Sequence, residues 1–339
     1  MPLPYDAILV VSFGGPEGPD EVLPFLENVL RGKNVPRERM LEVAEHYRHF
    51  GGVSPINAQN RALIAALRQE LDEHGPKLPI YWGNRNWRPL LADTLRQMAD
   101  DGVRRALAYV TSAYSSYSGC RQYREDIERA QQGVGPNAPH IDKLHVFFNH
   151  PEFIAAHVER LQAALNELPA EERDGAKLLF TAHSIPLAMA SGCDYELQLR
   201  ETCRLVCEPL GRTDWRLVFQ SRSGPPSQPW LEPDIGDALR QLAGEGTSRS
   251  VVIAPIGFLS DHIEVLYDLD TEAQQIAAEL GLRLVRAATV GQHPRFIGML
   301  RELILERLDP SQPRRALGPF GPRPDECSVD CCLSGRKPT

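Results

Sequence analysis

Residues 251–272 of the chain read VVIAPIGFLSDHIEVLYDLDTE, an apolar run that ends at a glycine and passes directly into an acidic segment. The run 251–256 is typical of a strand buried on both faces of a parallel sheet. Between Ser250 and Leu282 the chain has no Lys or Arg, yet it has six acidic residues and one histidine. Because ligands bind outside the carboxyl ends of parallel strands, this stretch predicts a polar site at the end of a buried strand.

The acidic segment has the spacing of a single helix face. If residues 264–280 are helical, Glu264, Asp268 and Glu272 fall at i, i+4 and i+8. Like charges at this spacing cost about 0.2–0.5 kcal/mol per pair, and no cation nearby in the sequence offsets that cost. A line of carboxylates is what a path for a cation requires, whereas the alternative interpretation is an ordinary solvated helix face.

Strand and helix patterns alternate along the chain and then begin again near residue 150. The expected strands span residues 7–13, 79–83, 106–111 and 144–148, then 176–182, 216–220, 251–256 and 282–287. The expected helices span residues 21–29, 62–71, 89–99, 120–132, 150–165, 195–206, 235–242, 264–280 and 294–308. This alternation predicts an α/β protein with two similar doubly wound, Rossmann-like parallel-sheet halves and an active-site cleft between them. We expect the halves at residues 1–149 and 150–309, and an extended cysteine-containing tail at residues 310–339.

The composition excludes several classes of protein. The 339 residues carry a net charge of −8, with 42% hydrophobic and 24% charged residues, which are values of a globular protein. Without a Lys/Arg run to contact phosphates, nucleic acid is not expected as a partner. No stretch approaches the ~20 apolar residues that a membrane-spanning helix needs. The N-terminus has no signal-peptide pattern, so we expect a cytoplasmic protein.

His183 and Glu264 follow two expected strands of the second half, and fold logic brings them to one edge of a sheet. A neutral imidazole beside a carboxylate suits a transiently held divalent cation or the abstraction of a proton. Two ligands are too few for a permanent zinc site, which normally takes three or four. The alternative is that His183 is a hydrogen-bonded structural residue.

Other polar and aromatic groups leave two interpretations open. The glycines of residues 14–18 do not fit a dinucleotide fingerprint. Ser54 has the position of a helix cap, although its turn could also receive a carboxylate. Tyr114, Tyr117 and Tyr123 are either ordinary packing residues or the lining of a flat, apolar ligand pocket.

The seven cysteines are too few and too scattered for a secreted disulfide framework. They form three groups: Cys120 alone, Cys193 with Cys203 and Cys207, and Cys327 with Cys331 and Cys332. In a reducing compartment the last group indicates a metal or iron–sulfur site that would order the tail. A loose thiol-rich tail is the alternative.

Eight segments, taken together and in order, resemble the ferrochelatase family over essentially the whole chain. They read SFGGP (12–16), FGGVSPIN (50–57), GNRNW (83–87), TSAYSSYS (111–118), TAHSIP (181–186), QSRSGPP (220–226), PWLEPD (229–234) and SDHIE (260–264). The resemblance implies a lyase of heme biosynthesis that inserts Fe²⁺ into a porphyrin and releases two protons. These segments resemble most those of the actinobacterial branch of the family. That resemblance favours coproporphyrin III as the substrate, giving coproheme, over protoporphyrin IX.

The resemblance also assigns roles by position. It implies that His183 and Glu264 are the catalytic, iron-binding pair and that Asp268 and Glu272 deliver metal or release protons. The porphyrin-binding positions that it implies are Phe13, Arg31, Ser54, Tyr123 and Trp230. Some relatives have an iron-ligating Tyr where this chain has Phe13, so that ligation cannot occur here.

Some members of the family hold a [2Fe–2S] cluster through C-terminal cysteines and one internal cysteine. The resemblance therefore implies Cys327, Cys331 and Cys332 as cluster ligands. The internal position falls near Ala156, which is not a cysteine, so the fourth ligand is open. The candidates are Cys120, Cys193, Cys203 and Cys207.

Three other functions remain as alternatives. A non-catalytic tetrapyrrole or metal carrier would bind porphyrin without needing His183 for metal insertion. An iron–sulfur redox or sensing protein would depend on the tail cysteines instead. A chelatase for cobalt or nickel would differ in its metal preference. We expect a monomer with no transmembrane segment, for which peripheral contact with a membrane is compatible with the sequence.

Overall fold

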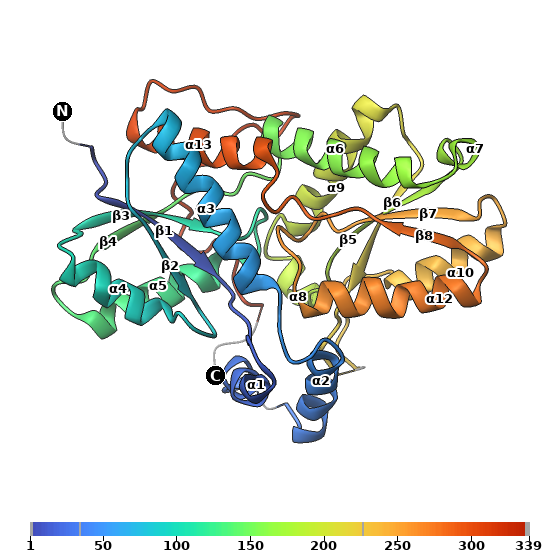
Figure 1. Ribbon diagram of the computed structural model, residues 1–339, viewed down its shortest axis with the longest axis horizontal. Helices are drawn as coiled ribbons and strands as arrows, with labels where there is room; N and C mark the ends of the chain where they lie inside the picture. Colours follow the sequence, from blue (N-terminus) through green and yellow to red (C-terminus); the bar gives the residue numbers. More distant parts are fainter. Residues whose placement is uncertain (1–2, 34, 226, 336–339) are drawn as a thin grey trace.

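A computed structural model describes residues 3–33, 35–225 and 227–335, and they form two α/β halves side by side (Figure 1). The first sheet contains β1 (Ala7–Ser12), β2 (Ile80–Asn84), β3 (Arg105–Val110) and β4 (His140–Lys143), in the order β2-β1-β3-β4. The second contains β5 (Lys177–His183), β6 (Trp215–Gln220), β7 (Ser250–Ala254) and β8 (Arg283–Arg286), in the order β6-β5-β7-β8. All strand pairs are parallel, and both sheets have the same strand order relative to the chain.

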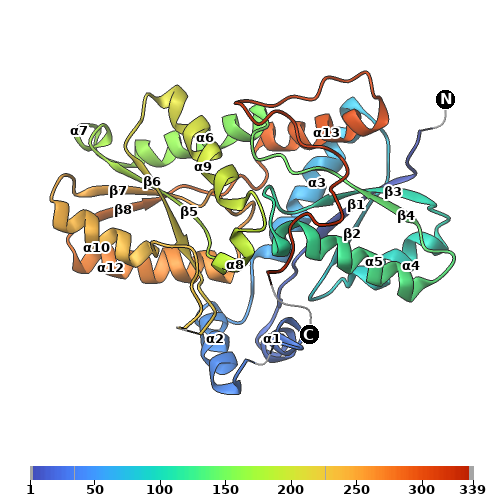
Figure 2. The same cartoon turned by 180° about the vertical axis from the view of Figure 1, so that it is seen from behind.

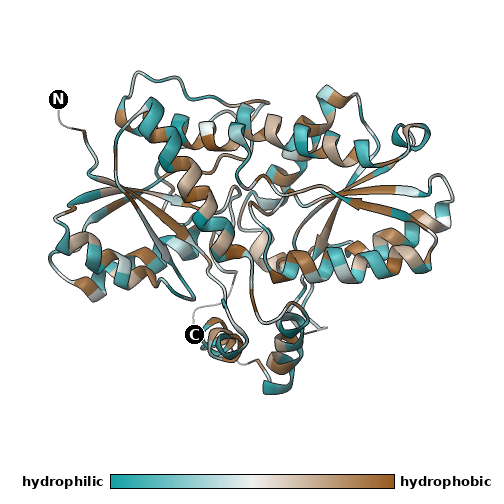
Figure 3. Cartoon of the chain, in the orientation of Figure 1, coloured by the Kyte–Doolittle hydropathy of each residue, from teal (hydrophilic) through white to brown (hydrophobic). Residues whose placement is uncertain are grey.

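Helices cover both faces of each sheet, because parallel strands are apolar on both sides and must be shielded from water (Figures 1 and 3). The first half contains α1 (Val22–Leu30), α2 (Arg37–His49), α3 (Ile56–His74), α4 (Leu91–Asp100) and α5 (Gln122–Val134). The second contains α6 (Pro151–Glu167), α7 (Ala170–Arg173), α8 (Leu187–Ala190), α9 (Tyr195–Cys207), α10 (Ile235–Glu245), α11 (Ile263–Val265), α12 (Gln274–Glu279) and α13 (Pro294–Leu308). Short 3₁₀ turns lie at Pro19–Glu21 and Glu208–Leu210, and π-helical segments at Tyr117–Arg121 (η2) and Leu266–Ala273 (η4). None of the helices in these described ranges is long and apolar enough to cross a membrane.

The predicted fold class is confirmed, and two local predictions are wrong. The expected strand at 144–148 is a buried connection, and β4 lies just before it at His140–Lys143. β4 pairs only with β3, so an edge strand of polar residues forms there, while the apolar run after it packs into the core between the halves. Ser54 is not a helix cap, because α3 begins at Ile56 without any side-chain capping hydrogen bond.

One hydrophobic core runs through both halves rather than stopping at their boundary. It includes Ile8 and Leu107 from the first sheet, Phe180 from the second, and the aromatic rings of Phe153 and Phe296 between them. Side chains of this kind stabilise a fold by roughly 1.5–3 kcal/mol each when fully buried. The two halves are therefore held together by packing, and the relative position of their strand ends is fixed.

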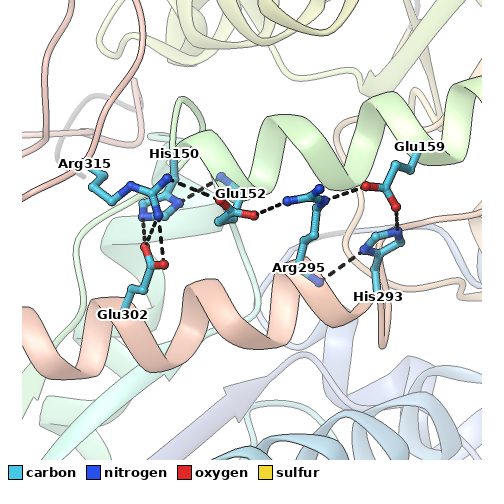
Figure 4. Close-up of polar contacts among 7 residues, drawn as sticks. All are labelled: His150, Glu152, Glu159, His293, Arg295, Glu302 and Arg315. Atoms are coloured by element: carbon cyan, nitrogen blue, oxygen red, sulfur yellow. Dashed lines mark hydrogen bonds and ion pairs between the residues drawn. The ribbon is translucent and has the colours of Figure 1, made fainter.

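Ion pairs join α6, α13 and the tail on the outer surface of this core (Figure 4). Arg295 of α13 contacts Glu152 and Glu159 of α6, and Arg315 of the tail reaches Glu152 and Glu302. The α13 helix also packs against α3, so it touches both halves. Isolated exposed pairs of this kind contribute little, but a shared network fixes the geometry of the helices that carry it.

The tail crosses the junction of the halves and ends beside α8 (Figure 2). In the first part of the tail, the side-chain amide of Asn149 donates hydrogen bonds to the carbonyl oxygens of Leu317 and Gly321. Near its end, Arg121 donates to the carbonyl oxygens of Val329 and Cys331. Side chains from the folded halves thus order a segment whose composition alone predicts disorder.

Replacing Gly257 with Ala is expected to destabilise the protein by about 1–3 kcal/mol through overpacking. A Cβ at this position would lie 2.6 Å from the Cβ of Ala182 and 2.7 Å from its Cα, between the ends of β7 and β5. Gly244→Ala is the control, because its Cβ would meet open space on α10. Urea unfolding should show the loss for Gly257→Ala and no loss for Gly244→Ala; equal midpoints would contradict the close packing of these strand ends.

Candidate active site

His183 is the last residue of β5, and its ring is fixed by the backbone beside it. The Nδ1 atom lies within hydrogen-bonding distance of the carbonyl oxygen of Ser184, which can only accept. Nδ1 must therefore carry the proton in the neutral ring, and Nε2 presents its lone pair. The ring is about one-third exposed, so this lone pair is accessible to a metal ion or a proton.

Glu264 follows β7 through the loop 255–262 and lies in the short helix α11. Its Oε2 atom is 3.7 Å from Nε2 of His183 and 4.0 Å from Nδ1 of His262. Burial lowers the pKa of His262, so this ring is neutral near pH 7. A lone pair and a carboxylate facing each other repel unless a cation or a proton lies between them, so the pair is suited to hold one.

Asp268 lies one turn further along the same helix, on η4. Its Oδ2 accepts hydrogen bonds from the Ser221 hydroxyl and from Nε2 of Gln220, which lies 3.2 Å away. Burial, reinforced by the charges of Glu264 and Glu272, raises the pKa of Asp268 to about 7, despite the hydrogen bond from Ser221. This carboxyl group can therefore gain or lose a proton at neutral pH.

The acidic line continues to Glu272 in the π-helical turn. Burial and the nearby Asp234 raise the pKa of Glu272 above its usual value. The predicted helix 264–280 exists as α11, η4 and α12 in succession, but its middle is π-helical rather than α-helical. Such widened turns occur frequently at functional sites.

The aromatic residues divide between the surface and the core. Phe13 is exposed, and its ring lies against Phe25 and under the guanidinium of Arg85. Tyr123 is buried, with the Arg85 guanidinium 4.6 Å above its ring centroid. Tyr114 is also buried, so it packs in the core as one of our two interpretations expected.

The remaining predicted porphyrin-binding positions differ in exposure. Arg31 is exposed at the end of α1, whereas Ser54 and Trp230 are buried. Among the described residues, the buried indole Nε1–H of Trp230 has no hydrogen-bond partner. Two surface hollows, one beside Val103 and one beside Arg307, lie away from His183, so the expected cleft between the halves stays a prediction.

The cysteines of the tail gather around one internal thiol. Sγ of Cys331 is 3.4 Å from Sγ of Cys332, and the thiols of Cys327 and Cys332 interact with the thiol of Cys120. These neighbouring S–H groups lower the pKa of Cys120 well below its usual value. Cys203 and Cys207, by contrast, are buried in the core on α9.

Gln220 and Ser221 are parts of the site to which the sequence pattern alone assigned no role. Gln220 donates to the Glu264 carbonyl oxygen at 3.3 Å as well as to Asp268. Ser221 has a φ of 61°, in the left-handed region that non-glycine residues rarely adopt. A signal was present, since Gln220 ends an expected strand and Ser221 directly follows it, at the edge where ligands bind.

Comparison with known proteins decides the family. The ferrochelatase family model matches residues 5–308. The chain belongs to the ferrochelatase family. It is 60% identical to the ferrochelatase of Rhodopirellula baltica, over 97% of this chain and 94% of the relative. It is 53% identical to the coproporphyrin III ferrochelatase of Nocardia farcinica, over 98% of both chains.

Solved structures support the fold of this ferrochelatase at much lower identity. A structure of SirB from Bacillus subtilis with Fe³⁺ superposes with a TM-score of 0.58 at 14% identity, covering 91% of this chain and 98% of that one. The cobalt complex of the sirohydrochlorin chelatase SirB gives a TM-score of 0.54 at 11% identity, covering 89% and 94%. At these identities the likeness shows only the shared two-half architecture.

The raised pKa of Asp268 predicts a specific pH dependence of stability. An Asp in the unfolded chain titrates near pH 4, so between about pH 4 and pH 7 the folded protein binds more protons than the unfolded chain. The stabilisation that this group gives is complete below the unfolded pKa and is lost as the pH rises to about 7. The free energy of unfolding of Asp268→Asn should therefore depend less on pH than that of the wild type. Across this window the value for the wild type should fall by up to about 4 kcal/mol relative to the variant.

Urea unfolding at closely spaced pH values would measure this difference. Asp237→Asn is a matched control, because Asp237 is exposed on α10 and pairs only with Arg240. Parallel pH profiles for wild type and Asp268→Asn would show that Asp268 titrates normally.

Proposed function

We propose that the chain is a coproporphyrin III ferrochelatase, which inserts Fe²⁺ into coproporphyrin III with release of two protons. The observation that carries the proposal is the facing pair at two strand ends, with Nε2 of His183 3.7 Å from Oε2 of Glu264. The Nε2 lone pair can accept a pyrrole proton, and the carboxylate can hold the cation until the porphyrin nitrogens replace it. The names of the 50–54% identical relatives support coproporphyrin III as the porphyrin.

The acidic line gives a route for the two protons or for the incoming metal. Glu264, Asp268 and Glu272 follow one another along a single helical segment. Because the pKa of Asp268 is about 7, this group can pass protons onward near neutral pH without being permanently charged. We propose that Asp268 and Glu272 serve this transfer.

The porphyrin contacts are proposed at five positions. Phe13 and Arg31 are exposed and can offer an apolar platform and a cation for a carboxylate. Ser54, Tyr123 and Trp230 are buried, and the N–H of Trp230 is available to an acceptor. A phenyl ring has no group to ligate iron, so Phe13 can only pack against the macrocycle.

Anaerobic metalation tests this function directly. Purified protein would be mixed with Fe²⁺ and either coproporphyrin III or protoporphyrin IX while the visible spectrum is followed. Wild type should metalate coproporphyrin III faster, and His183→Ala and Glu264→Gln should each lose about 10²-fold or more in rate. His140→Ala, an exposed histidine on β4, should behave as wild type.

Each failure has a distinct meaning. Porphyrin binding without metalation by the wild type would leave a tetrapyrrole carrier. Faster insertion of cobalt or nickel than of iron would indicate a chelatase for another metal. Unchanged rates in His183→Ala would remove this pair from the mechanism.

We also propose that Cys120 is the fourth ligand of a [2Fe–2S] cluster with Cys327, Cys331 and Cys332. The thiols of Cys327 and Cys332 lie beside Cys120, and Cys331 adjoins Cys332. Among the described residues, no group of three or more His, Cys, Asp or Glu side chains is arranged to hold a single metal ion. A [2Fe–2S] cluster needs a different arrangement, because its four thiolate ligands are spread over two irons. When bound, such a cluster supplies a one-electron redox centre and a cross-link from the tail to η2. We also propose a cytoplasmic location, because the seven cysteines are too few and too scattered for a secreted disulfide framework.

Cys120→Ala should lose the cysteinyl iron–sulfur absorption and the bound iron and sulfide of the purified protein. Cys203→Ala is the matched control, since its thiol is fully buried in the hydrophobic core on α9. Iron and acid-labile sulfide analysis would be done on both variants and on Cys193→Ala, whose side chain is half-buried. Retention of the cluster in Cys120→Ala and its loss in Cys193→Ala would transfer the fourth ligand to Cys193.

A further inference from the structure

We propose that Gln59 and His46, both from the first half, are positioning residues that hold the Glu264 carboxylate against His183. The inference rests on the proposed function, in which these two groups act on the same cation. His183 belongs to the second sheet, and the segment 261–267 that contains Glu264 follows a strand of that sheet. Nevertheless, both ends of this segment are held by side chains from the other half of the molecule.

Gln59 forms two hydrogen bonds with the N-terminal end of the segment 261–267. The backbone N–H of Asp261 donates to Oε1 of Gln59 at 2.8 Å, and Nε2 of Gln59 donates to Oδ2 of Asp261 at 3.4 Å. The other carboxylate oxygen of Asp261 accepts from Arg286 at 3.1 Å, and Arg286 also binds Asp270 through two nitrogens. Asp261 is therefore held from both halves at once, three residues before Glu264.

Gln59 is itself firmly placed in the first half. It lies in the first turn of α3, between Asn57 and Asn60. Nδ2 of Asn57 donates to the Gly15 carbonyl oxygen at 3.1 Å, and Nδ2 of Asn60 donates to Oγ of Ser12 at 2.8 Å, both in buried surroundings. The helical turn that carries Gln59 is thus tied to the end of β1, which places the Gln59 amide for its contacts with Asp261.

The C-terminal end of the segment is clamped by an aromatic stack. The ring of His46 on α2 lies parallel to the ring of Tyr267, with centroids 3.6 Å apart and an interplanar angle of 8°. His49, one turn further along α2, meets the same Tyr267 ring edge-on. Tyr267 is three residues after Glu264, so the stack and the Asp261 contacts lie on opposite sides of Glu264 along the chain.

These two contacts matter because the Glu264 side chain is half exposed, with His183 and His262 as its ionisable neighbours within 4.0 Å. The position of its carboxylate is therefore set by the backbone on either side of it. Loss of either contact would release one end of that backbone from the first half. A displacement of about 1 Å is enough to cost about 10²-fold in rate at a catalytic group.

The experiment compares Gln59→Ala, His46→Ala and His46→Phe with Gln69→Ala. The last is matched, because Gln69 is on the same helix and bonds only to Glu73 on the exposed surface. His46→Phe keeps a flat ring for the stack on Tyr267. For each variant we would measure kcat and KM for Fe²⁺, the Kd of coproporphyrin III by fluorescence quenching, and the melting temperature.

Gln59→Ala and His46→Ala should lose about tenfold or more in kcat, with the porphyrin Kd changed by less than about twofold. His46→Phe should recover most of the rate, and Gln69→Ala should match the wild type. A general loss of structure would instead lower the melting temperature and weaken porphyrin binding together. Wild-type kcat in both Gln59→Ala and His46→Ala, or equal losses in His46→Ala and His46→Phe, would overturn the proposal.

Zinc titration of the porphyrin-free protein separates this inference from the proposed function. We would follow Zn²⁺ binding by calorimetry in wild type, His183→Ala and the positioning variants. If the wild type fails to metalate any porphyrin, the proposed function fails. The positioning role still stands in that case if Gln59→Ala and His46→Ala weaken the Zn²⁺ affinity that His183→Ala abolishes, and it fails if their affinity is unchanged.

Discussion

The site depends on buried hydrogen bonds that tie the loop after β3 to the second half. The backbone N–H of Ser115 donates to Oε1 of Gln198 at 2.8 Å, and Nε2 of Gln198 donates to the Ser115 hydroxyl at 2.9 Å. The hydroxyl of the buried Tyr114 donates to the Ile256 carbonyl oxygen at 3.0 Å, at the end of β7. Unmade bonds at such buried groups would cost about 1–3 kcal/mol each, so one docked arrangement is strongly preferred. These hydrogen bonds add to the shared hydrophobic core, so the two sheets present their strand ends to each other in a fixed geometry.

Within this fixed arrangement, the acidic segment is stable only because the repulsion between its carboxylates is reduced. A buried carboxylate beside two others would be costly if all three were ionised. The cost is reduced by the raised pKa of Asp268 and by the hydrogen bonds from Gln220 and Ser221. The left-handed backbone at Ser221 is strain that persists because it aims the hydroxyl at Asp268. Stability and the proposed proton transfer thus impose the same arrangement on this segment.

The sequence predicts the parts of this protein that follow from local patterns. Buried runs such as 251–256 identify strands, and the alternation with helices identifies the two halves, because parallel sheets demand it. The pairing of His183 with Glu264 also follows, since His183 ends one strand and the segment with Glu264 follows a neighbouring strand of the same sheet. The polar edge strand at His140–Lys143 could not be predicted, because its apolar neighbour 144–148 has the stronger pattern while tertiary packing decides the outcome. The proposed fourth cluster ligand could not be chosen among the four candidate cysteines, because Cys120 meets the tail through folding across some 200 residues of sequence.

The transient cation site that we propose at His183 and Glu264 needs groups from both halves to position its ligands. A permanent metal site has enough ligands to organise itself around the ion, whereas two groups facing each other cannot. Here the lone pair of His183 and the carboxylate of Glu264 repel one another when nothing lies between them. Their 3.7 Å separation must therefore be maintained by groups that do not bind the ion. Gln59 holds Asp261 and His46 holds Tyr267, on the two sides of Glu264 along the chain. The protein scaffold rather than the metal therefore sets the geometry of the proposed site. The cation can then leave once the porphyrin offers it more nitrogen ligands.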